Sequence, residues 1–188
     1  PDSDGDGDNY LEDYYTVSIM DTDALAWHAT STDSYDGNSY WCGDEEIGGY
    51  LDSWIQFMDT PSFTVPNLST LSADLMWTIE DPAGAVVGGS CTDGWDAANV
   101  QISVDGGATW ALLTGNDPYD FDCGYGWIWN STEYDTGGSL NHLAAGWGGN
   151  ADWHNVTFSL SEYAGQEAII RFAFGSDPAF CTLDDGSI

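Results

Sequence analysis

An all-β fold is predicted from three features of this sequence. Short β-rich runs, each bounded by Gly, Asp, Asn, Ser or Pro, recur from residue 14 onward. Helix signals are nearly absent, and no repeat of fixed period is visible, which argues against a propeller or a solenoid. Eight or more strands separated by long Gly/Asp loops favour two packed antiparallel sheets, a jelly-roll β-sandwich, over one open sheet. The expected strands cover residues 14–20, 25–30, 53–58, 73–79, 99–104, 109–113, 154–160 and 168–174.

The clearest local element is a hairpin around Asp105-Gly106-Gly107. Apolar and polar residues alternate in Val-Gln-Ile-Ser-Val before this turn and continue in Ala-Thr-Trp after it. Two alternating runs joined by an Asp-Gly turn are typical of a hairpin with one buried face.

Length and composition indicate one domain with a short arm. A chain of 188 residues suits a single domain, and 42% hydrophobic residues, including 10 Trp, 10 Tyr and 7 Phe, can fill a sizeable core. The first residues differ from the rest because they alternate Asp with Gly, Ser and Asn. We therefore expect an acidic calcium-binding arm at 1–13 and a jelly-roll β-sandwich at 14–188.

The charge of the chain is strongly one-sided. Thirty-two acidic residues face a single base, Arg171, which gives a formal net charge of −31. Binding to DNA or RNA depends on Lys and Arg that neutralise phosphates, so nucleic acid is excluded as a partner, and anionic membrane surfaces are disfavoured. Because so much negative charge opposes compaction, we expect bound or screening cations to accompany the folded state.

The four cysteines, which lack C-x-x-C spacing and nearby His ligands, are more typical of two disulfides than of a zinc site. Three pairings are open. The numbers of residues that face each other across the hairpin sum to about 213, and those of Cys91 and Cys123 sum to 214. This predicts a Cys91–Cys123 bond and, by elimination, a Cys42–Cys181 bond, although loops on either arm would change this register.

The location expected from these features is secreted, extracellular or at the cell surface. The chain begins at Pro1 without a recognisable signal peptide, so we expect a mature or trimmed segment of a longer secreted product. No apolar run approaches the ~20 residues required to span a bilayer, so no direct membrane insertion is expected.

The arm resembles the calcium loops of thrombospondin type 3 repeats, dockerins and EF-hands. In the twelve-position loop the ligands lie at positions 1, 3, 5, 7, 9 and 12, with glycine at position 6. Ca²⁺ prefers six to eight oxygen ligands, which alternating carboxylates can supply. The alternative is a flexible acidic linker. With Asp2 at position 1, the template also takes in Asp4, Asp6, Gly7, Asp8 and Asp13.

An ordered series of segments between residues 24 and 188 resembles the MAM-like jelly rolls of secreted bacterial and archaeal proteins. These include the choice-of-anchor surface modules and the downstream domains of immune inhibitor A-type peptidases. The sequence departs from that pattern at 180–183, where the family usually has Gly-Trp before its terminal Asp-Asp. The segments that carry the resemblance are Trp27-His28, Tyr40-Trp41-Cys42-Gly43, Tyr50, Trp54, Pro61, Leu75-Met76-Trp77, Gly94-Trp95-Asp96, the hairpin sequence, 152–160, 161–177 and 183–188.

The resemblance implies a second Ca²⁺ site within the sandwich. Asp93 and Asp96 lie just before an expected strand, and Asp177, Asp184 and Asp185 lie near the end of the chain. Related jelly rolls often hold a structural ion between such places, and the positions carried over are Asp96 and Asp185. The alternative is that acidic residues are so frequent here that any two loops contain some.

Two further groups of residues indicate surface chemistry. Trp127 and Trp129 share one face of a strand-like Gly-Trp-Ile-Trp-Asn, where they could stack on sugar rings, although core packing is the alternative. Asn67, Asn130 and Asn155 each begin an Asn-x-Ser/Thr acceptor for N-glycosylation, a motif also expected by chance in so polar a chain.

No catalytic residues are predicted. His28, His142 and His154 form no His-Glu-x-x-His motif, and the sequence has no Gly-x-Ser-x-Gly elbow, P-loop or dinucleotide fingerprint. We therefore expect a non-catalytic structural, adhesive or assembly module, such as a subunit of a surface or extracellular fibre. Its expected partners are other extracellular or surface proteins, copies of itself, or glycans. The alternative is an ancillary substrate- or glycan-recognition domain of a secreted peptidase or glycosidase.

Overall fold

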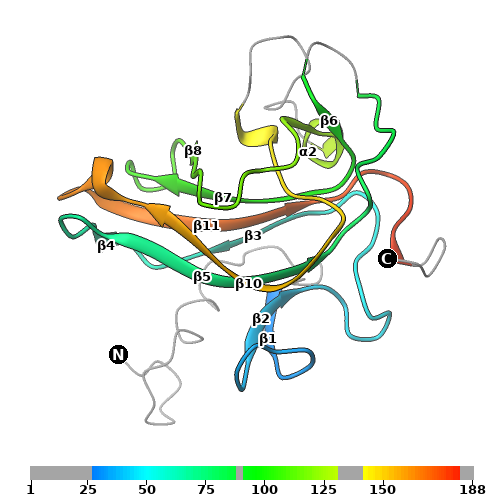
Figure 1. Cartoon of the computed structure of the whole chain (residues 1–188), viewed down its shortest axis with the longest axis horizontal. Coiled ribbons are helices and arrows are strands. Elements are labelled where there is room, and N and C mark those ends of the chain that lie inside the picture. The colour runs from blue at the N-terminus through cyan, green and yellow to red at the C-terminus, as the bar shows by residue number, and fades with distance from the viewer. Residues whose placement is uncertain (1–26, 88–90, 131–141, 183–188) are drawn as a thin grey trace.

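The computed structural model describes residues 27–87, 91–130 and 142–182 (Figure 1). The predicted arm at 1–13, the predicted strand at 14–20 and Asp185 lie outside the described residues. The strands are β1 (Trp27–Thr30), β2 (Ser39–Cys42), β3 (Ile55–Asp59), β4 (Phe63–Thr64), β5 (Thr70–Thr78), β6 (Asp93–Gly94), β7 (Ala97–Ser103), β8 (Ala111–Leu112), β9 (Cys123–Gly124), β10 (Asn150–Ser159) and β11 (Glu167–Gly175). The helical segments are α2 (Tyr125–Asn130) and the 3₁₀ turns η1 (His142–Ala144) and η2 (Ser161–Tyr163).

The described strands confirm an all-β fold built mainly of antiparallel pairs. The larger sheet has the order β3–β11–β7–β8, with β4 pairing on β11. Within it, β11 runs against β7 from Ile169 opposite Ser103 to Gly175 opposite Ala97. The second sheet pairs β5 with β10, and a small pair of β1 and β2 lies below it (Figure 1).

The two sheets pack face to face because each strand puts its apolar residues on one side. Along β5, exposed and partly buried positions alternate without interruption, as expected for a strand with one solvent face. The layer of β5 and β10 lies beneath the layer of β3, β11 and β7 (Figure 1). The core between them contains Val65, Val100, Ile102, Leu113, Trp147, Val156, Phe158, Leu160, Ala168 and Ile170.

A second apolar cluster covers the opposite face of the larger sheet. Its centre is Trp127, which is fully buried and stacks parallel to Phe57 at 6.4 Å between ring centroids. Trp127 lies on α2, so the strand-like reading of this segment was wrong. Gly126 allows the close approach, because a Cβ there would collide with the backbone of Gly175. The helix is therefore fixed by tertiary packing, which local sequence patterns do not report.

The same face holds the single Lys or Arg residue of the chain. Arg171 donates from Nε and Nη2 to the two carboxylate oxygens of Asp59, at 2.6 and 2.7 Å. Its guanidinium also lies 4.1 Å from the centroid of the Phe57 ring and 3.7 Å from that of the Trp110 ring. A planar cation held by two aromatic faces and a paired carboxylate is a strong local constraint on this sheet.

The turn after β7 is the predicted hairpin. Gly106 and Gly107 have φ of 75° and 90°, which glycine adopts without the steric cost of a side chain. The carboxylate of Asp105 accepts hydrogen bonds from the Thr109 amide at 2.8 Å, the Thr109 hydroxyl at 2.6 Å and the Ser103 hydroxyl at 2.8 Å. These donors lower the pKa of Asp105 to about 2.

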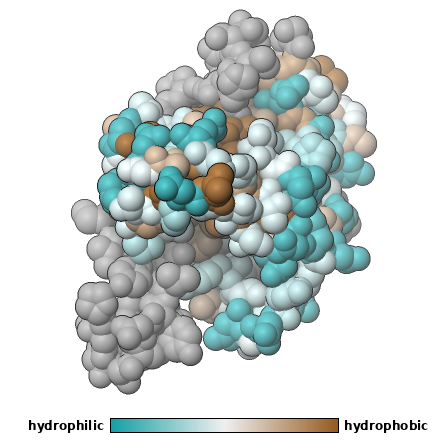
Figure 2. Space-filling model, turned by 60° about the vertical axis from the view of Figure 1, so that its left-hand side comes forward, coloured by the Kyte–Doolittle hydropathy of each residue, from teal (hydrophilic) through white to brown (hydrophobic). Residues whose placement is uncertain are grey.

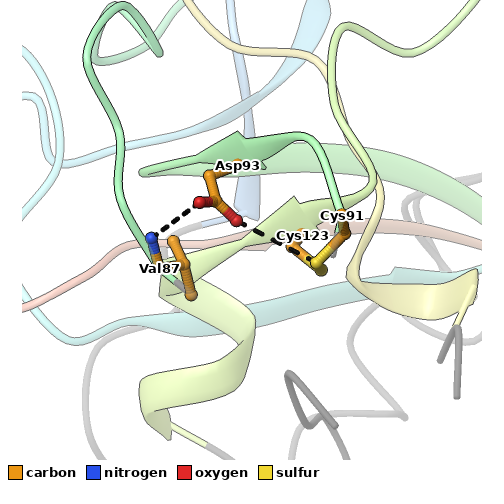
Figure 3. Close-up of a disulfide and its surroundings, with 4 residues drawn as sticks. All are labelled: Val87, Cys91, Asp93 and Cys123. Atoms are coloured by element: carbon orange, nitrogen blue, oxygen red, sulfur yellow. Dashed lines mark hydrogen bonds between the residues drawn. A yellow bond between two sulfur atoms is a disulfide. The ribbon is translucent and has the colours of Figure 1, made fainter. Parts of the chain in front are cut away.

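The predicted Cys91–Cys123 disulfide is confirmed. The two cysteines do not, however, face each other across an extended hairpin, as the prediction assumed. Strands β6 and β9 pair in parallel, with Asp93 opposite Cys123, rather than as an extension of the antiparallel hairpin. Asp93 lies between the disulfide and the amide of Val87, from which it accepts a hydrogen bond at 3.0 Å (Figure 3). The bridge thus fixes the loop before β7 to the segment that leads into α2.

The second predicted bridge is wrong, because Cys42 and Cys181 are not bonded to each other. Both pack as small apolar side chains in a cluster with Tyr50, Ile79 and Phe174 at one end of the sandwich. Burial raises the pKa of the Cys42 thiol. These two cysteines therefore act as core residues in this structure.

The surface of the described residues is largely hydrophilic on one face. On the face shown in Figure 2, hydrophobic residues form small separate patches among hydrophilic ones. None of the described helices is long and apolar enough to cross a membrane.

Candidate metal centre

Three carboxylates from distant parts of the chain meet at one end of the larger sheet. Asp96 immediately precedes β7, and Asp177 follows β11 by two residues. Because β7 and β11 are antiparallel with Ala97 opposite Gly175, the start of one strand and the end of the other lie together. Glu80, which follows β5 in the second sheet, completes the group, so both layers contribute to it.

The three side chains are close together and largely withdrawn from solvent. One carboxylate oxygen from each lies within 4.8 Å of the other two. Asp96 is 1% exposed and Asp177 is 5% exposed, whereas Glu80 is partly buried. Carboxylates are rarely buried without a compensating group, so this concentration of negative charge requires a physical explanation.

Hydrogen bonds fix one oxygen of Asp96 and leave the other without a partner. Asp96 Oδ1 accepts from the Asp177 amide at 2.6 Å. Asp177 Oδ1 in turn accepts from the Ala179 amide at 2.9 Å. Within the described part of the chain, Asp96 Oδ2 and Asp52 Oδ1 are both buried and have no hydrogen-bond partner. The carboxylate of Asp96 is therefore held in place with one acceptor atom unused.

Tyr50 and Asp52, in the loop between β2 and β3, add to this environment. The Tyr50 hydroxyl accepts from the Glu80 amide at 3.0 Å and lies beside the carboxylate of Asp96, where it favours the charged form of that carboxylate. Burial, and then the charge of Asp96, raise the pKa of Tyr50. The charge of Asp52 acts on both Asp96 and Asp177. Asp52 is thus an acidic neighbour of the group, whose oxygens within 4.8 Å of one another come from Glu80, Asp96 and Asp177.

The electrostatics favour uptake of positive charge here. Burial raises the pKa of Asp96 to about 7, against the effects of the Asp177 amide and the Tyr50 hydroxyl. Burial also raises the pKa of Asp177, against the effect of the Ala179 amide. The only Arg or Lys in the sequence is Arg171, which is paired with Asp59. The charge can therefore be balanced by a proton on Asp96 or by a metal cation.

The oxygen-only donor set fits a hard divalent cation. Ca²⁺ takes six to eight oxygens from carboxylates, backbone carbonyls and water, and tolerates irregular geometry. Asp96, Asp177 and Glu80 would supply carboxylate oxygens, and the buried unpartnered Oδ2 of Asp96 is the atom most in need of such a partner.

The sequence-based predictions for this site agree with the structure in part. Asp96 lies in the group, but its predicted partner Asp185 lies outside the described residues, as do Asp2, Asp4, Asp6, Asp8 and Asp13 of the arm. The calcium ligands therefore stay a prediction. Cys91, Asp93 and Cys123 also lie close together, but the two sulfur atoms are bonded to each other and are not available as thiolate ligands.

The tryptophans and asparagines that were predicted to lie at the surface differ in their exposure. Trp127 is fully buried, so it cannot stack on a sugar, whereas Trp129 is 55% exposed. Asn67 is exposed in a turn, and Asn130 ends α2. Asn155 is exposed on β10, where its amide nitrogen donates to Ser72 Oγ and Asp74 Oδ1 across the strand pair. Whether these three asparagines carry glycans stays a prediction.

Sequence reasoning missed Glu80 as a member of the centre and Asp52 as its acidic neighbour. Asp177 lies three residues after the expected strand at 168–174 and could have been chosen on that signal. Glu80 likewise follows β5, but only the packing of one sheet on the other brings it to Asp96.

Comparisons of the chain with protein-family models, with curated proteins and with solved structures found no match.

Proposed function

We propose that this chain is a non-catalytic extracellular module whose β-sandwich is stabilised by Ca²⁺ and which serves a structural, adhesive or assembly role. In this proposal the sandwich is a jelly roll, preceded by an acidic calcium-binding arm at 1–13. It acts as a subunit of a surface or extracellular assembly, in contact with other extracellular proteins or with copies of itself.

The observation that carries the proposal is the carboxylate of Asp96. It is 1% exposed, one of its oxygens is buried without a partner among the described residues, and Asp177 and Glu80 lie beside it. Leaving such a charge uncompensated in a protein interior costs several kcal/mol. A bound Ca²⁺ removes that cost and joins the loop before β7, the segment after β11 and the segment after β5.

An extracellular setting agrees with the same features. Calcium-binding modules outside cells commonly have dissociation constants of about 10⁻⁴ to 10⁻³ M. The Cys91–Cys123 disulfide is compatible with an oxidising compartment. A net charge of −31 is best tolerated where divalent cations and salt are abundant.

Thermal unfolding with and without a chelator tests the proposal. A ligand that binds only the native state at 100 times its dissociation constant stabilises that state by about 2.7 kcal/mol. For a chain of this size, that corresponds to a fall in Tm of roughly 5–10 °C when the ion is removed.

Two variants assign the effect to a site. Asp96→Asn should lose most of the chelator effect, because it removes the buried charge while keeping Oδ1 as an acceptor for the Asp177 amide. A variant with Asp4→Asn and Asp6→Asn in the arm should keep the effect that arises at the sandwich. The proposal fails if the Tm of the unmodified chain does not respond to chelation, or if Asp96→Asn responds as strongly as the unmodified chain.

A further inference from the structure

A cavity of about 510 Å³ lies between the β1–β2 hairpin and the adjacent end of the sandwich. This volume is within the range of pockets that bind small organic groups, roughly 300–1,000 Å³. Its lining includes four large aromatic side chains and two carboxylates from the described residues: Trp27, Tyr40, Trp41, Trp153, Asp33 and Glu45.

The aromatic residues of this cavity are held by other parts of the fold. Trp153, on β10, donates from its indole Nε1 to the backbone oxygen of Asp33 at 2.9 Å, and its ring lies 5.6 Å from that of Tyr35. Trp41, on β2, lies against Gly43, where a Cβ would collide with the indole. The second sheet and the hairpin therefore set these two indoles in fixed positions, which lowers the entropy cost of binding.

The charged groups of the cavity are acidic. Glu45 is exposed, and its Oε1 accepts from the Thr30 hydroxyl at 2.8 Å, which orients the carboxylate. No Lys or Arg is among the described lining residues, and Arg171, the only Lys or Arg of the sequence, is engaged elsewhere. Beside the cavity, His28 Nε2 lies 3.6 Å from Glu45 Oε1. A concave surface of one sign concentrates counter-ions, so the cavity attracts cations and repels anions.

Arg171 shows how this protein already holds an organic cation. Its guanidinium lies over the faces of Phe57 and Trp110 and pairs with Asp59. The cavity offers the same two kinds of group, aromatic rings and carboxylates, without a Lys or Arg among its described lining residues. We propose that this cavity binds an arginine side chain presented by a partner polypeptide, with the guanidinium on the aromatic rings and near Glu45 or Asp33.

The partner must be a different sequence. Arg171 is the only Lys or Arg in these 188 residues and is 17% exposed in its side chain, so a second copy of them has no free guanidinium to offer. This inference goes beyond the proposed function and does not rest on a bound metal. Tyr50 is nevertheless shared by the two places, because it lines the cavity and its hydroxyl accepts from the Glu80 amide at the metal centre.

Binding of a blocked tripeptide, acetyl-Gly-Arg-Gly-amide, tests the proposal, with tryptophan fluorescence and the indole N–H signals in NMR as readouts. The matched ligand replaces arginine by citrulline, which has nearly the same shape and no charge. We expect the arginine peptide to shift indole signals saturably and the citrulline peptide to bind at least tenfold more weakly. Equal binding of the two peptides, or preferential binding of a neutral saccharide such as glucose, would overturn the proposal.

Protein variants separate the cavity from the general acidity of the chain. Glu45→Gln keeps an oxygen for the Thr30 hydroxyl and removes the charge, so we expect roughly fivefold weaker binding of the arginine peptide, with Asp33→Asn as the second test. Glu46→Gln, at an exposed neighbour outside the cavity, is the control and should change binding less than twofold. If all three variants weaken binding equally, the peptide binds diffusely and the proposal is wrong. The titration is repeated in Ca²⁺ and in chelator to distinguish peptide binding at the cavity from ion binding at the metal centre. Because the inference does not rest on a bound metal, we expect the arginine peptide to bind under both conditions.

Discussion

The carboxyl group of Asp96 should make the calcium-free protein less stable as the pH rises. Its pKa is 3.8 for an ordinary Asp and about 7 in the folded chain, because burial disfavours the charged form. Between these values the folded state keeps a proton that the unfolded state has released, so the free energy of unfolding falls as the pH rises through this window. A difference of about three pH units at 1.36 kcal/mol each predicts a loss of about 4 kcal/mol by pH 8.

Asp96→Asn isolates this contribution. We would measure urea unfolding in chelator at pH 5 and pH 8 for the unmodified chain, for Asp96→Asn and for the control Asp36→Asn. Asp36 is exposed in the hairpin loop between β1 and β2, so it matches the change in charge without the burial. At pH 8 the Asp96→Asn protein should be more stable than the unmodified chain by a few kcal/mol, and at low pH this advantage should shrink.

Calcium should reverse the sign of the pH effect. With Ca²⁺ bound, Asp96 must be ionised, so protons compete with the metal and stability should rise with pH. The reasoning is refuted if Asp96→Asn and Asp36→Asn have the same pH dependence in chelator, because burial of Asp96 would then carry no electrostatic cost.

Three other predictions follow from single contacts in the described residues. Replacing Arg171 by Met leaves the carboxylate of Asp59 without its partner and should lower the free energy of unfolding by about 3–5 kcal/mol, measured by urea unfolding, whereas Arg171→Lys should lose less because it keeps the charge. Replacing both Cys91 and Cys123 by Ala removes a bridge between residues 32 positions apart, so the unfolded chain gains conformational entropy. The free energy of unfolding should fall by about 4 kcal/mol in the same assay, and an unchanged urea midpoint would contradict this. Protonation of Asp105 at pH values approaching 2 should lower the protection factor of the Thr109 amide, which is its exchange rate relative to an unstructured amide at the same pH. The low pKa means that the stabilising hydrogen bonds are complete above pH 3.8 and are lost as the pH falls; an unchanged protection factor would show that the carboxylate does not hold the turn.

The sequence predicts the strands best where the information is local. The hairpin at Asp105 was predicted because alternation and turn residues act within a few positions, and β5, β7, β10 and β11 each overlap an expected strand. The short strands β2, β4, β6 and β9 were missed. Strands of two to four residues carry too few positions for a period to be visible, and their pairing depends on neighbours far away in the chain.

The candidate site was only partly predictable for the same reason. Asp96 and Asp177 lie beside two long strands whose ends can be read from the sequence. Glu80 joins them only because the second sheet packs on the first, and no spacing rule reports that contact. The helix at Trp127 shows the converse case, since two tryptophans two positions apart share a face in a strand but lie on different sides of a helix, as their exposures of 0% and 55% confirm.

The central claim is that a calcium ion binds between the two layers at Asp96. Crystals of the full chain grown in CaCl₂ and measured at a long X-ray wavelength would test it through the anomalous signal of calcium. The account predicts an anomalous peak about 2.3–2.6 Å from Asp96 Oδ2, with oxygens of Asp177 and Glu80 in the same coordination shell. A structure at saturating Ca²⁺ with no peak there, and with Asp96 in contact only with protein and water, would contradict it.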